Sequence, residues 1–458
     1  MITRLGTIFN FLFGSDAHER LKLLFLSILF FLLIGGYTVI RTLKDSLFTK
    51  IVGTEYMPLA KIWSIIVLIP AILIFSKLVD LMRRYQLLYL YCFLYGLGCL
   101  AITYCIGHPV IGLLNTETSK YRVFGWVVYF FLEGINPFLI SLAWSFSHSI
   151  TSPNEAKVNY PMMVAASKLG GMLTAGLSCW LLARTAIGGD ILATDILNHQ
   201  IILGISSLFL LAAPIILYVF LHKVPNKFMH GYEAAYKEER RHEHERRSKG
   251  IKAFFADMFS GALLLFKYPY TLGIFGVMFF WEIVNVFLNL TRIGVAQKAA
   301  TSLSGQTYIL LHQDFWVHAV GIFITILGTR TFLNLLGERI SLLVVPFVIG
   351  GLLICYFSVQ SATALTFVFV LTRAINYAFA YPLRESLYIP TSKDIKFKSK
   401  TWIEAFGVKI AKAVGSSLVF AAGFGVFSVI ISMWVVTAHF LGRRFERAIK
   451  NNEVIGQS

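Results

Sequence analysis

Long apolar segments recur along nearly the whole chain, and they restrict its fold more than any other feature. Of the 458 residues, 57% are hydrophobic and only 14% are charged, and the mean hydropathy is +0.69. The runs are 18 to 29 residues long, and about 20 residues are enough for a helix to cross roughly 30 Å of hydrocarbon. The runs do not show the alternation over segments of about ten residues that marks a membrane β-barrel. The sequence therefore predicts an all-α integral membrane protein.

The apolar runs form two sets of six. A long charged stretch, HKVPNKFMHGYEAAYKEERRHEHERRSKGIKAFF, separates the sets and is typical of a solvated helical connector that leads into an amphipathic segment. Two parallel six-helix halves joined in this way match the major facilitator architecture, whose substrate site lies between the halves near the midplane. The twelve predicted spans lie near residues 21–48, 57–79, 86–107, 123–149, 160–184, 200–221, 270–292, 308–330, 340–360, 362–390, 402–422 and 424–441.

The order of apolar and charged segments divides the chain into four parts. The first apolar run is interpreted as a retained membrane helix, since no short apolar core with a small-residue cleavage site precedes it. The two halves also repeat one feature loosely, because short polar turns with basic residues follow both the second and the eighth span. We expect an N-terminal half at 1–221, a cytoplasmic connector with an amphipathic helix at 222–269, a C-terminal half at 270–442 and a cytoplasmic tail at 443–458.

Lysine and arginine are distributed unevenly between the predicted loops. Most of them fall on the side that would hold both termini and the connector. The opposite loops hold only Lys50, Lys120, Arg122, Arg184, Arg292 and Lys298. By the positive-inside rule, we expect both termini and the connector in the cytoplasm. The formal net charge of +17 is then mainly a topology signal, and it argues only weakly for a nucleic-acid partner.

Charged side chains also fall inside the predicted spans. The acids are Asp45, Glu133, Glu282, Glu385 and Glu404. The eight cations are Arg41, Lys44, Lys61, Lys168, Arg373, Arg384, Lys409 and Lys412. Eight cations facing lipid would cost on the order of 20 kcal/mol, which exceeds the roughly 5–15 kcal/mol of a typical net stability. We therefore expect a wet, electropositive cavity and an anionic ligand.

Helical spacing groups several of these cations into pairs. Arg41 and Lys44 are three residues apart, as are Lys409 and Lys412, so each pair shares one face of its helix. We expect these four side chains to bind phosphate groups of the ligand.

A third group lies in the tenth predicted span. Arg373, Tyr377 and Arg384 differ by four, seven and eleven residues, which returns all three to nearly the same side of a regular α-helix. Two guanidinium groups on this face could each bind phosphate oxygens with two parallel hydrogen bonds, and the ring of Tyr377 could stack on a base or ribose. A polyphosphate attached to a ring system fits this pattern.

The acids within the spans have several interpretations. Asp45 and Glu385 each lie next to a cation in the sequence and fit structural ion pairs with neighbouring helices. Glu133 and Glu282 lie alone in otherwise apolar segments, FFLEGINPFLI and MFFWEIVNVF. They could neutralise the site cations between transport steps, carry a coupling proton or serve a structural role.

The remaining features favour structural roles. Lys61 and Lys168 fit snorkelling towards the membrane surface as well as they fit a site. His242 and His244 lie in the charged connector, and the five cysteines are scattered through apolar segments without metal-ligand spacing. The sequence contains no glycine-rich phosphate loop and no catalytic grouping of side chains, so we expect no enzyme activity, no cofactor and no metal site.

Three long segments carry a family resemblance: YTVIRTLKDSLFTKIVGTEYMPLAKIW, FLEGINPFLISLAWSFSHSITSPNEAKVNYPMM and AYPLRESLYIPTSKDIKFKSKTWIEAFGVKIAK. The first resembles the first conserved block of the ATP/ADP translocases of plastids and obligate intracellular bacteria. The second is similar to that family's fourth span and following loop, and the third to its tenth span, loop and eleventh span. The resemblance implies twelve spans, a nucleotide substrate, and exchange or import across a bacterial cytoplasmic (inner) membrane.

The resemblance also implies roles for particular residues. Asn136 lies in the second segment and is included among the candidate binding residues, and Arg384 stands where relatives tend to carry lysine. Four residues fall on charges on which transport in the family depends: Lys44, Glu133, Glu282 and Lys412. The full set of candidate substrate-binding residues is Arg41, Lys44, Glu133, Asn136, Glu282, Arg373, Tyr377, Arg384, Lys409 and Lys412.

The leading hypothesis is a secondary transporter that binds a nucleotide di- or triphosphate between its two halves. Exchange of ATP for ADP is the reaction that the family implies, and proton-coupled import of GTP or another nucleotide is an alternative. A transporter of another phosphorylated organic anion is a further alternative, and a membrane enzyme or lipid flippase is a third class. We expect a monomer surrounded by lipid.

Overall fold

Helices account for nearly all of the chain that the structure describes. The computed structural model describes residues 17–151, 153–183, 190–225, 263–327, 329–392, 395, 399–418 and 423–456. Within these ranges the only β pairing is an isolated bridge between Thr391 and Ile455. The predicted all-α fold is therefore confirmed. Most of the predicted connector, including His242 and His244, lies outside the described residues.

Ten of the described helices are long and apolar enough to cross a membrane, as judged by length and composition. They coincide with ten of the twelve predicted spans. The other two predicted spans, near 308–330 and 402–422, are helical where they are described, in α12 (Leu303–Leu327) and α17 (Val408–Leu418). The protein is therefore a multi-pass membrane protein.

Contacts between α-carbons divide the chain into two compact units. The division runs through α12, because its residues up to Ala319 belong to the first unit and the others to the second. Unit 1 comprises Met1–Tyr56, Ile66–Ser248 and Ala296–Ala319. Unit 2 comprises Met57–Ile65, Lys249–Val295 and Val320–Ser458.

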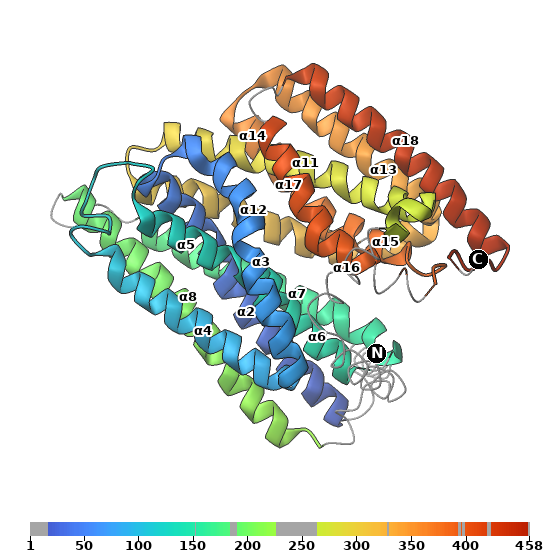
Figure 1. Cartoon of the computed structure of the whole chain (residues 1–458), viewed down its shortest axis with the longest axis horizontal. Helices are drawn as coiled ribbons and strands as arrows, with labels where there is room; N and C mark the ends of the chain where they lie inside the picture. The colour runs from blue at the N-terminus through green and yellow to red at the C-terminus, as the bar shows by residue number, and fades with distance from the viewer. Residues whose placement is uncertain are drawn as a thin grey trace, which may run out of the picture. The chain divides into compact units, whose positions relative to one another are not determined.

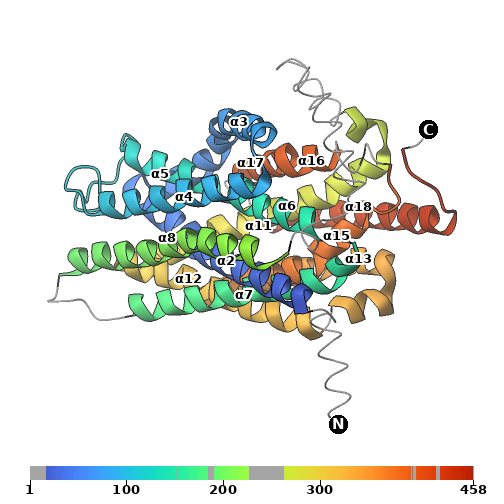
Figure 2. The ribbon, with the colours of Figure 1, turned by 90° about the horizontal axis from the view of Figure 1, so that it is seen from below.

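The long helix α2 (Ala17–Ile51) is the main packing partner of the other helices of unit 1. It runs alongside α7 and α8 (Figure 2), and α8 in turn packs along α4 (Figure 1). The helix α3 (Met57–Leu81) follows a short 3₁₀ turn, η1 (Thr54–Tyr56), and is divided between the units. The other helices of unit 1 are α4 (Arg84–Ile106), α5 (Val123–Glu133), α6 (Ser141–Ile150), α7 (Pro153–Leu182) and α8 (Ile191–Lys223).

Glycines allow α2 to lie unusually close to both neighbours. A β-carbon on Gly170 of α7 would lie 2.3 Å from the carbonyl oxygen of Phe31, and one on Gly36 would lie 2.9 Å from the carbonyl oxygen of Ser206 on α8. Real β-carbons do not approach other atoms this closely, so only glycine fits at either position. Close contact between small residues is a main source of helix association in lipid. It holds α2 in place and thereby fixes the direction of its polar side chains.

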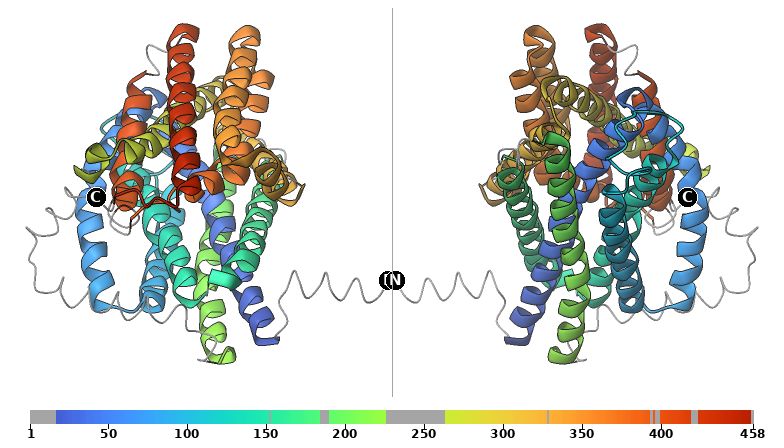
Figure 3. Two further views of the ribbon diagram at one scale, coloured as in Figure 1. Left: turned by 90° about the vertical axis from the view of Figure 1, so that its right-hand side faces the viewer. Right: turned by 90° about the vertical axis from the view of Figure 1, so that its left-hand side faces the viewer.

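In unit 2, α13 (Thr329–Val359) and α18 (Phe424–Lys450) run side by side (Figure 3), and α14 (Ala362–Ile375) packs on α13. Gly337 has a φ of +69°, and this left-handed conformation bends the helical path within α13. The remaining helices of the unit are α11 (Pro269–Ala299), α15 (Tyr381–Ser386), α16 (Lys400–Trp402) and α17.

Three π-helical turns interrupt predicted spans within the described residues. They are η2 (Ile135–Ile140) between α5 and α6, η5 (Asn376–Ala380) between α14 and α15, and η7 (Ile403–Gly407) between α16 and α17. A π turn contains more residues than an α-helical turn and rotates the side chains that follow it.

The η5 turn corrects the predicted common face of Arg373, Tyr377 and Arg384. That prediction assumed 3.6 residues per turn throughout, but η5 begins after Arg373, contains Tyr377 and ends before Arg384. The burial of the first two side chains differs accordingly, since Arg373 is 7% exposed and Tyr377 is 36% exposed.

Candidate functional site

Lys44 on α2 is the most enclosed of the candidate cations, with 4% of its surface exposed. Its ammonium nitrogen lies 2.6 Å from Oε2 of Glu133, at the end of α5, and 3.4 Å from Oδ1 of Asp45. The ring of Tyr129, one turn before Glu133, lies 4.6 Å from the same nitrogen. A buried charge is tolerated only when it is paired, and Lys44 is paired twice. The structure thus brings together Lys44 and Glu133 from two separate spans.

Arg41 lies one turn earlier on α2 and is held by a different acid. Its Nη2 atom lies 3.0 Å from Oδ1 of Asp314 on α12, and the hydroxyl of Thr42 donates a hydrogen bond of 2.6 Å to Oδ2 of the same carboxylate. Asp314 is fully buried. Asp314 was not predicted as a site residue, although, like Glu133, it is the only acid in its own predicted span.

In unit 2, Glu282 and Arg373 are linked through a neutral amide. The Nδ2 group of Asn285 donates to Oε2 of Glu282 at 3.0 Å, and Nε of Arg373 donates to Oδ1 of Asn285 at 3.1 Å. The guanidinium of Arg373 also lies 5.0 Å from the ring centre of Phe369. An amide between an acid and a cation keeps both charges oriented and apart. Asn285 was not predicted, because an asparagine in an apolar run carries no charge signal.

The structure corrects the predicted position of Arg292. It was predicted to lie in a loop, but α11 continues to Ala299 and Arg292 is 1% exposed inside it. Its Nε group donates to Oδ1 of Asn289 at 3.1 Å, and its guanidinium lies 4.1 Å from the ring centre of Phe369. Phe369 therefore contacts two guanidinium groups, those of Arg292 and Arg373, which places two cations next to each other in unit 2.

The acids near Arg384 are bound to a lysine. Lys400 Nζ lies 2.5 Å from Oε2 of Glu385 and 3.8 Å from Oε1 of Glu404. Arg384 itself forms no ion pair with a carboxylate among the residues that the structure describes, and its guanidinium lies 5.6 Å from the ring centre of Tyr381. Glu385 therefore pairs with Lys400 and not with its sequence neighbour Arg384.

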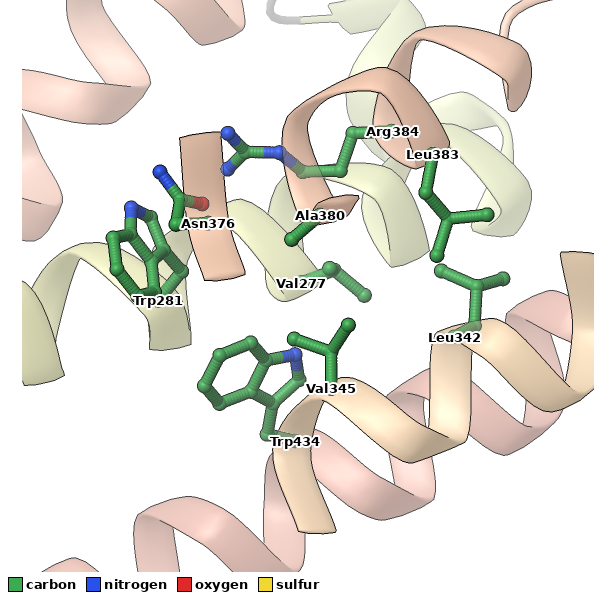
Figure 4. A pocket seen from close by; sticks show the side chains of 9 residues that line it. All are labelled: Val277, Trp281, Leu342, Val345, Asn376, Ala380, Leu383, Arg384 and Trp434. Atoms are coloured by element: carbon green, nitrogen blue, oxygen red, sulfur yellow. The ribbon is translucent and has the colours of Figure 1, made fainter. Parts of the chain in front are cut away.

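Arg384 also borders a small pocket within unit 2. The cavity measures about 10 Å³, roughly the room for one water molecule, and is lined mainly by apolar side chains of α11, α13, η5, α15 and α18. Figure 4 shows the guanidinium of Arg384 and the amide of Asn376 on one side of the pocket and the indole of Trp434 on another. Small-molecule sites usually measure about 300–1,000 Å³. The pocket is too small for a whole nucleotide.

The remaining candidates differ in their surroundings. Lys409 and Lys412 lie three residues apart on α17, as predicted, and both are half-buried. Lys412 makes no ion pair within the described ranges, and Asn136 in η2 is exposed. No three His, Cys, Asp or Glu side chains of the described chain are grouped as metal ligands.

Comparison with known proteins agrees with the resemblance. A family model described as the TLC ATP/ADP transporter matches residues 3–442. The chain belongs to this family. It is therefore a transporter and not an enzyme. Two similar proteins are ADP,ATP carrier protein 3 of Rickettsia bellii, 22% identical with 94% of each chain covered, and ADP,ATP carrier protein 1 of Chlamydia pneumoniae, 22% identical with 98% of this chain and 96% of the relative covered.

Solved structures show the same architecture at low sequence identity. A D-xylose-proton symporter superposes with a TM-score of 0.60 at 16% identity and covers 92% of this chain and 97% of its own. A mutant of the nucleoside transporter NupG gives a TM-score of 0.52 at 14% identity, with 93% and 99% covered. A third structure, of the proton:xylose symporter XylE, is described as a major facilitator superfamily protein and gives a TM-score of 0.57 at 16% identity, with 92% and 95% covered. The predicted major-facilitator-like fold is thereby confirmed.

Proposed function

We propose that the protein is a secondary transporter that moves nucleotide di- and triphosphates across a membrane by alternating access, with exchange of ATP for ADP as its main reaction. The observation that carries this proposal is the pairing of two cations within one membrane helix, the buried Lys44 and the half-buried Arg41. Lys44 and Arg41 lie in a membrane helix of an ATP/ADP transporter family member, and carboxylates hold them at 2.6 and 3.0 Å.

The carboxylates take the place that phosphate oxygens would occupy. A phosphate accepts the same charge-assisted hydrogen bonds as a carboxylate and carries more negative charge. When the substrate arrives, a phosphate oxygen replaces Glu133 at Lys44, and Glu133 turns away from the cation. When the substrate leaves, Glu133 returns. The buried cation is therefore neutralised in both states, which allows the site to empty without leaving an unpaired charge in the membrane.

The cations of unit 2 supply the remaining charge. Arg384 and Lys412 form no ion pairs in the described part of the chain, so they need not be separated from an internal acid before they bind a phosphate. Arg373 is oriented by Asn285, and Lys409 shares a helix face with Lys412. The partly exposed ring of Tyr377 is suited to stacking on the base, and the amide of Asn136 is suited to hydrogen bonding.

We further infer how the chain is placed in its membrane. The halves at 1–221 and 270–442 bind the substrate between them near the midplane, as in other major facilitator proteins. The connector at 222–269, the tail at 443–458 and both termini lie in the cytoplasm, on the side to which the positive-inside rule assigns most of the basic residues. The membrane is a bacterial inner membrane, and the transporter works as a monomer.

Uptake into bacterial cells that express the chain tests this function. Radiolabelled ATP is offered outside, and unlabelled ATP, ADP, GTP, CTP, UTP and NAD compete with it. We expect ATP and ADP to compete best, uptake to persist with a protonophore, and preloaded label to leave only when nucleotide is present outside. The variant Lys44→Ala should lose uptake, whereas Lys120→Ala, which removes an exposed loop lysine, should not.

Three other results would replace the proposal with an alternative. Loss of uptake with a protonophore would identify proton-coupled import. Preferential competition by GTP would identify a different nucleotide as substrate. Absence of competition by every nucleotide would contradict nucleotide transport and favour another phosphorylated anion.

A further inference from the structure

The first half of α12 is attached to α8 and α2 by an unusually polar contact. The side chain of Asp195 on α8 accepts hydrogen bonds from the backbone amides of Leu303 and Ser304, each 2.9 Å long. It thus caps the N-terminus of a helix that lies more than 100 residues later in the chain, and it satisfies two amides that have no partner within α12. Asn198, one turn after Asp195, donates to the hydroxyl of Ser304 at 3.2 Å.

Two more buried pairs extend this contact. The Nδ1 group of His199 donates a hydrogen bond of 2.7 Å to the carbonyl oxygen of Asp195 on the same helix. The Nε2 atom of His199 therefore accepts a hydrogen bond of 2.9 Å from the hydroxyl of Thr307 on α12. The amide of Gln306 donates to the hydroxyl of Thr49 on α2 at 2.9 Å. We call this set the α12 clasp: Thr49, Asp195, Asn198, His199, Leu303, Ser304, Gln306 and Thr307.

The chemistry of the α12 clasp suits a contact that opens and closes. All of its side chains are buried, yet they meet through hydrogen bonds and not through an apolar seam. An apolar seam costs free energy when it opens to water, whereas polar groups exchange their partners for water at little net cost. By the proposed orientation the clasp lies at the non-cytoplasmic end of α12, where the substrate passage must close in one state and open in the other.

The clasp is linked to the candidate phosphate site along α12 itself. About two turns beyond Thr307, the buried carboxylate of Asp314 pairs with Arg41 and accepts from Thr42. One turn further, Nε2 of His318 lies 3.1 Å from the hydroxyl of Thr38. The same face of α2 therefore holds α12 and carries a cation predicted to bind the substrate.

We propose that Asp314 competes with the substrate's phosphates for Arg41, and that loss of the Arg41–Asp314 ion pair opens the α12 clasp. This inference rests on the proposed nucleotide transport. A phosphate at Arg41 neutralises the guanidinium and repels the carboxylate, so the buried ion pair that joins α12 to α2 at Asp314 is lost. Movement of α12 away from α2 brings Asp314 to water, and the clasp separates with it. Asp314 is thus a positioning residue that makes opening depend on the charge of the ligand.

A native cysteine can report the state of the clasp. The thiol of Cys179 on α7 lies 3.9 Å from the carbonyl oxygen of Tyr308 on α12 and is 9% exposed. The reporter protein keeps Cys179 and has alanine at the other four cysteines: Cys92, Cys99, Cys105 and Cys355. The purified reporter is treated with a small maleimide with and without ATP or ADP, and the rate of alkylation is measured together with nucleotide binding to the same sample.

Nucleotide should accelerate alkylation of Cys179 several-fold in the reporter, and inorganic phosphate should do so only weakly. The variant Asp314→Asn should be alkylated rapidly without nucleotide and should bind ADP about tenfold more tightly, because the competitor is gone. Asp314→Glu keeps the charge and should restore the dependence on nucleotide. Thr42→Val removes only the hydroxyl contact and should give an intermediate rate, which tests the idea even if Asp314→Asn fails to fold.

The outcomes separate the two proposals. In one outcome the reporter binds nucleotide, but Cys179 is alkylated at the same rate with and without nucleotide, and also at that rate in Asp314→Asn and Thr42→Val. This outcome would overturn the role of Asp314 and leave nucleotide transport standing. Reporter protein that binds no nucleotide would overturn both proposals, since the competitor for Asp314 would then be absent.

Discussion

Replacement of Glu133 by glutamine tests most directly whether an internal acid stands in for the substrate. Glu133 Oε2 lies 2.6 Å from the ammonium of Lys44, which is 4% exposed, so the substitution removes one member of a buried ion pair. Such a loss costs about 3–5 kcal/mol when the remaining charge has no other partner. Asp45 remains at 3.4 Å, and the Glu133 side chain is 17% exposed, so we expect about 2–3 kcal/mol in the nucleotide-free protein.

The same change should strengthen binding. A phosphate no longer has to displace Glu133, so part of the free energy lost from the nucleotide-free protein reappears as affinity. Since about 1.4 kcal/mol corresponds to a factor of ten, we expect Kd for ADP to fall by at least about tenfold. Transport should slow at the same time, because only Asp45 is then left to pair with Lys44 when the site empties.

Equilibrium binding of labelled ADP to purified protein, together with uptake by cells, measures both effects. The matched control is Glu117→Gln, which makes the same chemical change at an exposed loop residue and should alter neither quantity. An unchanged or higher Kd in Glu133→Gln would refute the reasoning, since it would mean that Glu133 either does not compete with the phosphates or contacts the nucleotide itself.

Three further predictions concern unit 2. Arg384→Ala should weaken ADP binding by about tenfold or more at low salt, because a charge-assisted contact is worth about 1.5–3 kcal/mol. The loss should be smaller at high salt, because ions screen the contact. Binding titrations at two ionic strengths measure the difference. Arg292→Met should lower thermal stability in detergent more than Arg384→Ala does, since only Arg292 is fully enclosed. The Arg444 guanidinium holds the pKa of Glu453 below its usual range, so the tail should be fully docked above the ordinary glutamate pKa and should detach as pH falls through the lowered value. The docked tail protects the amide of Ile455, which donates to the carbonyl of Pro390, so amide exchange at Ile455, corrected for its intrinsic rate, should follow this change. Glu453→Gln should abolish the pH dependence.

Hydropathy alone predicted the spans because hydrocarbon thickness and helical rise fix the length of an apolar segment. It failed for Arg292, since α11 continues past the end of its apolar run, and a charged residue near that end looks like part of a loop. Helix ends depend on backbone hydrogen bonding, which hydropathy does not record.

The candidate site was predictable where a charge interrupts an apolar run, as for Lys44 and Glu133. The same signal is present at Asp314 and would have found it. Asn285 gives no such signal, because its side chain carries no charge, and only its position between Glu282 and Arg373 reveals its role. Which acid pairs with which cation depends on helix packing, which no local pattern in the sequence specifies.

The π-helical turns η2 and η5 occupy corresponding places, in the fourth and tenth predicted spans, and each follows a candidate site residue on the preceding helix, Glu133 or Arg373. Such a turn holds one surplus residue, which offsets the side chains after it by about 100° around the helix axis from their places in an unbroken α-helix. The fourth and tenth spans therefore each present side chains before and after the turn in combinations that a regular helix of the same sequence would point apart.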